Sequence, residues 1–384
     1  MPQALSAEDE LCLCLARGDL PPEVRRRSAE LLQAPLRWDI LLQRVREHQV
    51  LPLVYRNLRT LEFQGVPSGP RTQLSVAFRA NALRNVFLCR ELTRIMRLLG
   101  EAGLQVIPLK GVTLAESLYG DPAYRVCTDL DILVPADQAA RARRLLLANG
   151  YTEEFPHPDC PLIPQSEFHD YILEVHSSLL QQSSQEKAAL QDIWSLAQPQ
   201  EILGAPAFAL SPEWLFLYLV GHAAGHKWDL LKWLADIHQI CLAANMDWRL
   251  VREKAKRFDL DLALVPTLTV CSTLFGTPVP AGLPSQALPP GVRLFPNSVA
   301  PEETWNEHFF YAGLLKRPSE KVRWLVETLF VPHLSDRRFI HLPASLDFLY
   351  FVLRPLRLIW KWSWRLLSAD LRGLGRWLGF RSKL

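Results

Sequence analysis

The sequence predicts an α+β fold that is mostly helical, with a small mixed β-sheet core between N- and C-terminal helical regions. Three observations lead to this fold. Through most of residues 1–103, apolar residues recur with a spacing near 3.6, the period of a helix with one buried face. Short apolar or alternating segments at 104–109, 130–134 and 171–176 are typical of sheet strands. Helical patterns return after Ser211, a residue type that caps helices.

These patterns divide the chain of 384 residues into four parts. We expect an N-terminal helical region at 1–103, an α/β core at 104–205, a helical bundle packed on the core at 206–290, and a helical extension with a basic, tryptophan-rich tail at 291–384. This length suits two domains or one elaborated domain.

In the first region we predict helices that begin after Ser6 and at Pro22, two more at 38–48 and 51–61, and a long one at 70–102. The long helix stops where Gly100 and Gly103 follow its apolar stripe. No residue pattern here indicates chemistry, so we interpret the region as a cap on the core.

Inside the core we predict strands at 104–109 and 130–134, a short helix from Val112, a helix at 135–148, a strand at 151–155, an irregular segment at 156–164 and a strand at 171–176. Successive side chains on a strand point to opposite faces, so Asp129 and Asp131 share a face. Adjacent carboxylates repel each other, and a hard divalent cation between them removes the repulsion. The pattern therefore favours a metal site.

The turn before Val112 suits the phosphate end of a substrate. Gly111 lets the backbone approach a ligand, and the helix that follows directs free N–H groups at an anion. Lys110 and Arg125 bring positive charge nearby. The alternative interpretation is a surface turn with a solvated pair of aspartates, which is the usual meaning of Asp-x-Asp alone.

One family shows the same set of motifs: Lys110-Gly111, Tyr119-Gly120-Asp121, Arg125 and Asp129-Leu130-Asp131. Over residues 105–245 the chain resembles the bacterial nucleotidyltransferase-like family of uncharacterised members (the NTP-transferase type 5 group), within the polymerase-β-like superfamily. The resemblance implies a nucleotidyltransferase core, an NTP substrate, and Mg²⁺ or Mn²⁺ held by Asp129, Asp131 and a third carboxylate. It also implies that Lys110, Gly111 and Arg125 hold the phosphates.

The resemblance places the third carboxylate at Glu174, on the strand at 171–176. Glu174 would complete the metal site or take the proton of the acceptor hydroxyl. His176 lies on the same face, where it would orient a carboxylate or contact phosphate. The alternative for Glu174 is a half-exposed strand carboxylate without a role.

The helical bundle carries a second group of polar residues. His222 and His226 share one helical face, but no Cys pair lies nearby in sequence, so we do not favour a zinc site. The family's downstream helical motif is matched by His222, Trp228, Lys232 and Asp236. We expect Lys232 to meet the triphosphate, and Asp236 to pair with Lys232 or His222. The alternative is a buried helix pair with satisfied polar groups.

The tail is basic and aromatic: residues 354–384 hold eight Lys and Arg against one acidic residue, and four tryptophans. Such a segment can lie on an anionic membrane surface, or can pack on the protein or a partner. Peripheral contact with a membrane through 354–384 is therefore a hypothesis of its own.

Composition narrows the classes of function. The net charge of +3 does not favour nucleic acid as a partner. Seven scattered cysteines indicate a reducing compartment, and the first residues show no signal-peptide pattern, so we expect a cytoplasmic protein, with the inner face of the membrane as its place of contact.

We predict a metal-dependent nucleotidyltransferase that moves an NMP from an NTP to a hydroxyl of an unknown acceptor, which could be a small molecule, a sugar or a peptide, and releases pyrophosphate. The alternative is a non-catalytic nucleotide-binding or scaffold protein of a biosynthetic cluster, at the membrane surface or away from it.

Overall fold

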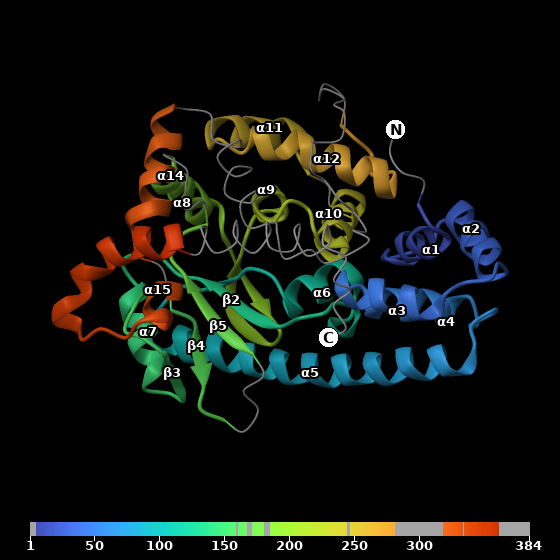
Figure 1. Ribbon diagram of the computed structural model, residues 1–384, viewed down its shortest axis with the longest axis horizontal. Helices are drawn as coiled ribbons and strands as arrows, with labels where there is room; N and C mark the ends of the chain where they lie inside the picture. Colours follow the sequence, from blue (N-terminus) through green and yellow to red (C-terminus); the bar gives the residue numbers. More distant parts are fainter. Residues whose placement is uncertain are drawn as a thin grey trace, which may run out of the picture. The chain divides into compact units, whose positions relative to one another are not determined.

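The computed structural model describes residues 5–158, 160–166, 171–179, 185–243, 246–280, 318–332 and 334–360 (Figure 1). The chain forms two compact units, Met1–Leu314 and Leu315–Leu384. The fold is α+β and mostly helical, as the sequence predicts. The finer division into four parts stays a prediction.

The first unit begins with the predicted helices, which are α1 (Ala7–Leu15), α2 (Pro22–Leu32), α3 (Trp38–Glu47), α4 (Leu51–Thr60) and α5 (Ser68–Glu101). Ser6 starts the first of them, because its hydroxyl accepts a hydrogen bond from the N–H of Asp9 at 3.1 Å. The C-terminal half of α5 is apolar on one side and packs against the sheet with Leu88, Leu92 and Leu99.

The sheet has five strands in the order β1-β2-β5-β4-β3. Their bounds are β1 (Ile107–Pro108), β2 (Asp129–Leu133), β3 (Tyr151–Glu153), β4 (Leu162–Pro164) and β5 (Ile172–His176). β2 runs parallel to β5, whereas the other pairs are antiparallel, so the sheet is mixed as predicted. Short elements connect the strands: α6 (Val112–Tyr119), the 3₁₀ helix η1 (Pro122–Tyr124) and α7 (Ala139–Leu147).

The two central strands have different faces. Leu130 and Ile132 of β2, with Leu173 of β5, are buried in a core that α5 and α7 complete. The opposite face of β2 and β5 is turned toward α9 and α10 (Figure 1). This alternation gives the aspartates of β2 one common face that lies outside this core.

Four helices follow the sheet: α9 (Pro212–Gly225), α10 (Leu231–Ala243), α11 (Trp248–Arg257) and α12 (Asp261–Phe275), with α8 (Glu186–Leu196) before them. Ser211 caps α9, as predicted, by accepting from the N–H of Trp214 at 3.3 Å. Trp214 and Trp228 are fully buried among these helices and belong to the larger core of the unit.

Some predicted elements differ from the observed ones. The segment 156–164, predicted to be irregular, contains β4, and a hairpin of β6 (Gln198–Ile202) and β7 (Ala205–Ala209) was not predicted. The helix predicted at 135–148 begins only at Ala139. The sequence predicts the next helix from Trp228, but α10 begins at Leu231. Lys227 and Trp228 have positive φ angles, which a right-handed helix does not allow.

The second unit contains α14 (Pro318–Phe330), α15 (Leu334–Phe339), the 3₁₀ helix η2 (Ala344–Leu349) and helical residues 350–360. The sequence also predicts a proline-rich loop at 283–301 and a helix at 302–315. Both lie wholly outside the described residues, as does the tail beyond 360. In the part of the chain that the structure describes, no helix combines the length and apolar character needed to cross a membrane.

Candidate active site

Strands β2 and β5 bring the predicted acidic residues together. Their parallel register places Asp131 opposite Glu174 and Leu133 opposite His176. Because side chains alternate along each strand, Asp129, Asp131, Glu174 and His176 share one face. The sequence predicted this grouping from two segments that are more than 40 residues apart.

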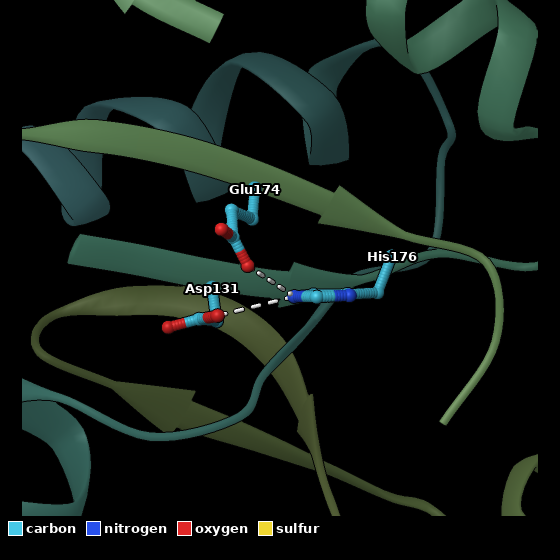
Figure 2. A group of neighbouring side chains, drawn as sticks. All are labelled: Asp131, Glu174 and His176. Carbon is cyan, nitrogen blue, oxygen red and sulfur yellow. Dashed lines mark hydrogen bonds and ion pairs between the residues drawn. The ribbon is translucent and has the colours of Figure 1, made fainter. Parts of the chain in front are cut away.

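His176 connects the two carboxylates of neighbouring strands (Figure 2). Its Nε2 lies 3.1 Å from Asp131 Oδ1 and 3.3 Å from Glu174 Oε2. Burial lowers the pKa of His176, but the hydrogen bonds to Asp131 and Glu174 outweigh burial and raise that pKa to about 9. The ring is therefore an imidazolium at neutral pH, and its hydrogen bond lowers the pKa of Glu174.

Lys110 neutralises the other side of the acidic group. Its Nζ lies 3.0 Å from Asp129 Oδ2 and 3.2 Å from Asp131 Oδ2. Burial alone would lower the pKa of Lys110. The charges of Asp131 and Asp129 have the larger effect, so the pKa is raised and the ammonium stays charged. Burial alone would raise the pKa of Asp129. The charge and hydrogen bond of Lys110 outweigh burial, so the pKa of Asp129 is lowered.

Gly111 places Lys110 at the start of α6. Its φ of 78° and ψ of −130° form a backbone conformation that is open essentially to glycine alone. A Cβ would meet only the carbonyl of Asp129, at an ordinary 3.5 Å, so the dihedral angles rather than space demand glycine here. No side-chain hydrogen bond caps α6, and its first N–H groups suit an anion beside the carboxylates.

The donor set fits a divalent cation. Potential ligand atoms of Asp131, Glu174 and His176 lie within 4.8 Å of one another. Among the described residues, this is the group of three side chains that could hold a metal ion. Asp131 Oδ2 is buried without a hydrogen bond, since Lys110 approaches it at ion-pair distance only. A buried carboxylate oxygen without a donor is costly, and a hard cation would satisfy it. A protonated His176 has no free lone pair at Nε2, so in this state it contacts the two carboxylates rather than a cation. The predicted ligand set of Asp129, Asp131 and Glu174 stays a prediction.

Arg125 and Asp236 support the site from behind. Arg125 Nε donates to Asp236 Oδ2 at 3.0 Å, and Tyr119 Oη donates to Asp236 Oδ1 at 2.9 Å. All three side chains are buried, and Asn85 Nδ2 donates to the carbonyl of Arg125 at 2.8 Å. This network joins α6, α10 and the segment that leads into β2. Arg125 thus has a supporting position in this structure, and the phosphate contact expected of it stays a prediction.

Lys232 also has partners that the sequence did not predict. Its Nζ donates to Gln49 Oε1, and lies 3.4 Å from the carbonyl of Val126. The predicted pairing of Asp236 with Lys232 or His222 is wrong, because Asp236 is already satisfied by Arg125 and Tyr119. Burial, and then the charge of Arg125, lower the pKa of Lys232 to about 8.

An aromatic cluster from α9 and α10 lies near the carboxylates. The rings of His222 and His226 are 4.9 Å apart, and Trp233 lies 5.1 Å and 4.8 Å from them. Burial, and then the charge of Lys110, lower the pKa of His222 to about 2. Burial raises the pKa of Tyr218, and the charges of Asp131 and Asp129 raise it further. Its ring centroid lies 6.1 Å from that of His222, so Tyr218 belongs to the same cluster.

With this geometry in place, comparison with known proteins identifies the family. A family model described as uncharacterised nucleotidyltransferase matches residues 34–276. The chain belongs to this family of nucleotidyltransferases. No curated protein matches the sequence.

Two solved structures are similar to about half of this nucleotidyltransferase, over nearly the whole of their own chains. The antibiotic-resistance factor ANT(2'')-Ia is 13% identical, with a TM-score of 0.34, over 45% of this chain and 92% of that one. An antigenic nucleotidyltransferase-like protein from Paracoccidioides brasiliensis is 18% identical, with a TM-score of 0.32, over 49% of this chain and 96% of that one.

Of the residues predicted for this nucleotidyltransferase site, the structure brings together Lys110, Asp129, Asp131, Glu174 and His176. Gly111 lies beside them in sequence and shapes the turn. Tyr218, Trp233 and Gln49 lie near the site or contact its residues, but they were not among the predicted site residues. Tyr218 could have been found from the sequence. Tyr218, His222 and His226 recur every four residues, a spacing that places side chains on one side of a helix.

Proposed function

We propose that the protein is a metal-dependent nucleotidyltransferase that transfers an NMP from an NTP to an acceptor hydroxyl and releases pyrophosphate. One observation carries the proposal: the cluster of buried Asp131 with half-buried Glu174 and His176. Asp129 and Lys110 lie beside it, and Lys110 precedes the start of α6. Membership of the nucleotidyltransferase family supports the type of reaction and an NTP as substrate.

Asp129, Asp131 and Glu174 would hold Mg²⁺ or Mn²⁺, which supplies neutralisation of the triphosphate charge when it is bound. The free N–H groups of α6 and the ammonium of Lys110 would hold phosphate oxygens. His176 would keep Asp131 and Glu174 in place through its two hydrogen bonds.

In the transfer, the acceptor oxygen forms a bond to the α-phosphorus while the bond between that phosphorus and the oxygen leading to the β-phosphorus breaks. Pyrophosphate leaves with the electron pair of the broken bond. The hydroxyl proton goes to a carboxylate in contact with solvent and substrate. Glu174, whose side chain is 36% exposed, either takes this proton or completes the metal site.

The charge of the first unit bears on the acceptor. Outside residues 315–384, the sequence holds 29 Lys and Arg against 35 Asp and Glu, so the unit that carries the site is acidic. An acidic surface repels nucleic acid, which leaves a small molecule, a sugar or a peptide as the proposed acceptor. A bacterial source and a cytoplasmic location with contact at the inner face of the membrane stay proposals from the sequence.

A second candidate function rests on Lys110. Its ammonium already compensates both carboxylates of β2 without a metal ion. A nucleotide-binding or scaffold protein without catalysis would be stable in that state. The two functions differ in one property: only the enzyme requires a divalent cation at the carboxylates in order to bind NTP.

Thermal unfolding with each NTP, with and without Mg²⁺ or Mn²⁺, tests the proposed function. A ligand that binds only the folded protein raises the unfolding midpoint. We expect a rise that requires metal and disappears in the Asp129→Asn/Asp131→Asn variant. Glu153→Gln is the matched control, because Glu153 is a carboxylate of the same sheet that pairs with Arg143 away from the site. A rise that needs no metal would favour the nucleotide-binding protein without catalysis. No rise with any NTP would contradict the enzyme and favour the scaffold.

A further inference from the structure

The helix at residues 350–360, in the second unit, presents an apolar face to solvent. Its exposed large side chains are Phe351, Val352, Leu356, Ile359 and Trp360, and the last is 60% exposed. At 100° per residue these positions cover one half of the helix, and that half contains no charged side chain. We call this half the apolar face.

The opposite side of the same helix is buried and carries the charges. Arg354 Nη1 lies 2.6 Å from Asp336 Oδ2, and Arg357 Nε lies 2.7 Å from Asp336 Oδ1. Arg354 Nε also donates to the carbonyl of Thr328 at 2.8 Å. A helix on the surface of a soluble protein turns its charges outward and its apolar residues inward. This helix does the reverse, so its apolar face is built to be covered.

Other elements of the second unit also expose large apolar side chains. Of the exposed large apolar residues among the described positions, fourteen lie in the second unit and seven in the much longer first unit. On α14 they recur at the spacing of one helical stripe: Val322, Leu325, Val326 and Phe330. A pocket of about 220 Å³ lies beside the helix at 350–360, and Phe339, Leu356 and Trp360 are among the residues that line it. Large exposed apolar surfaces mark contacts with a membrane or a partner, and the apolar face of the helix at 350–360 is such a surface.

Charge decides between these occupants. Residues 315–384 hold fourteen Lys and Arg against five Asp and Glu, whereas the rest of the chain is acidic. The sequence that follows the helix, 361–384, holds six basic residues, one acidic residue and three tryptophans. An anionic bilayer offers an apolar layer for the face and negative headgroups for the basic residues, and tryptophan favours the boundary between the two.

We propose that the helix at 350–360 docks in the plane of an anionic lipid bilayer, with Val352, Leu356, Ile359 and Trp360 in the boundary between headgroups and acyl chains. We propose that the helix lies on the membrane rather than across it, since among the described residues no helix is long and apolar enough to span a bilayer. The proposal is independent of the reaction at the carboxylates, and it assigns the predicted membrane contact to a defined face.

Flotation of the full chain with phosphatidylcholine vesicles, with and without phosphatidylglycerol, tests the proposal. We expect binding to the anionic vesicles, weakened by salt because the headgroup attraction is screened. In Leu356→Asp/Ile359→Asp, two charges stand where apolar side chains should enter the bilayer, so we expect a loss of binding of about tenfold or more. Both residues are exposed, so the variant should fold, which circular dichroism checks.

Val76→Asp/Leu83→Asp is the matched control, because both residues are exposed on α5 of the first unit and lie seven positions apart. This control should bind vesicles like the unchanged chain. The proposal is overturned if the unchanged chain binds neither vesicle, or if Leu356→Asp/Ile359→Asp binds as well as the control. Sedimentation velocity tests the alternative occupant. If the unchanged chain does not bind vesicles but forms dimers, and Leu356→Asp/Ile359→Asp abolishes them, the apolar face contacts a second copy of the chain instead.

Discussion

Lys110 lies where the two carboxylates of β2 would otherwise repel each other. Its Nζ is 3.0 Å from Asp129 and 3.2 Å from Asp131, and only 12% of its side chain is exposed. The sequence predicted that Lys110 binds phosphate. Without a ligand, its ammonium instead neutralises the two aspartates. A bound metal ion and Lys110 would compensate the same charges.

This competition predicts the behaviour of Lys110→Met. Without metal, the variant leaves two uncompensated acids, so we expect it to lose about 3 kcal/mol of unfolding free energy. Added Mn²⁺ should restore most of that loss, as measured by denaturant unfolding. Lys256→Met, at an exposed position of α11, should respond to neither condition. An unchanged stability of Lys110→Met without metal would contradict the role given to Lys110.

Arg125 allows a sharp distinction between support and phosphate binding. Removing one partner of a buried ion pair costs about 3–5 kcal/mol, whereas replacing both by apolar residues costs less. We expect Arg125→Met to be strongly destabilised, and Arg125→Met/Asp236→Leu to recover part of the loss. Chemical unfolding of the three proteins measures this. If Arg125→Met keeps full stability and only binds NTP more weakly, Arg125 contacts phosphate after all.

The sequence predicted some of these residues better than others. The shared face of Asp129 and Asp131 follows from strand alternation alone, and the structure bears that face out. The pairing of Arg125 with Asp236 joins residues 111 positions apart, and no local pattern encodes such a contact. The sequence therefore pointed to the charged residues, but the partner of each depended on how α10 packs against the core.

At the scale of elements, the turn between β1 and α6 sets the site. Its backbone at Gly111 lies in a region where other residues are strained by roughly 1–3 kcal/mol, while Gly120 at the other end of α6 has ordinary left-handed angles. We expect Gly111→Ala to lose about 2 kcal/mol of stability and the stabilisation by metal and NTP, because Lys110 and the helix start both move. Gly120→Ala should lose about 1 kcal/mol and keep the ligand response.

Thermal unfolding with and without Mn²⁺ and NTP measures both glycine variants. Gly120→Ala serves as the control for a general loss of stability, since neither position is crowded enough to exclude a Cβ. If both variants keep the full ligand response, the turn at Gly111 has no part in binding.

Helices were easier to predict than short strands. Caps and proline positions marked the starts of α1, α2 and α9, since these signals are local. The strand β4 and the hairpin of β6 and β7 contain Pro164, Pro199 and Pro206, which read as breaks in a strand pattern. Their place in a sheet depends on partners that are distant in sequence or on an edge that tolerates proline.

At the scale of the whole molecule, buried histidines make stability depend on pH. Burial lowers the pKa of His48 and of His238 to about 4 in each case. Both side chains are almost fully buried, and His238 Nδ1 lies 2.9 Å from Thr277 Oγ1. Between pH 6.5 and 4 the unfolded chain binds protons that the folded chain does not, so stability is present above this window and is lost as pH falls through it.

We therefore expect each histidine to cost about 2 kcal/mol of unfolding free energy between pH 6.5 and pH 5. Guanidinium unfolding at the two values measures the loss for the unchanged chain, and His48→Gln/His238→Gln should lose less over the same interval. An equal loss in the double variant would mean that other groups control the acid side of the stability curve.

The measurement that tests the central claim most directly is electron paramagnetic resonance of Mn²⁺ with a non-hydrolysable NTP. The account predicts one bound Mn²⁺ that couples to phosphorus, present in the unchanged chain and in Glu153→Gln, and lost in Asp131→Asn. Binding of Mn²⁺ and NTP that Asp131→Asn leaves unchanged, or no bound Mn²⁺ in the folded protein with NTP, would contradict a metal-dependent site on β2 and β5.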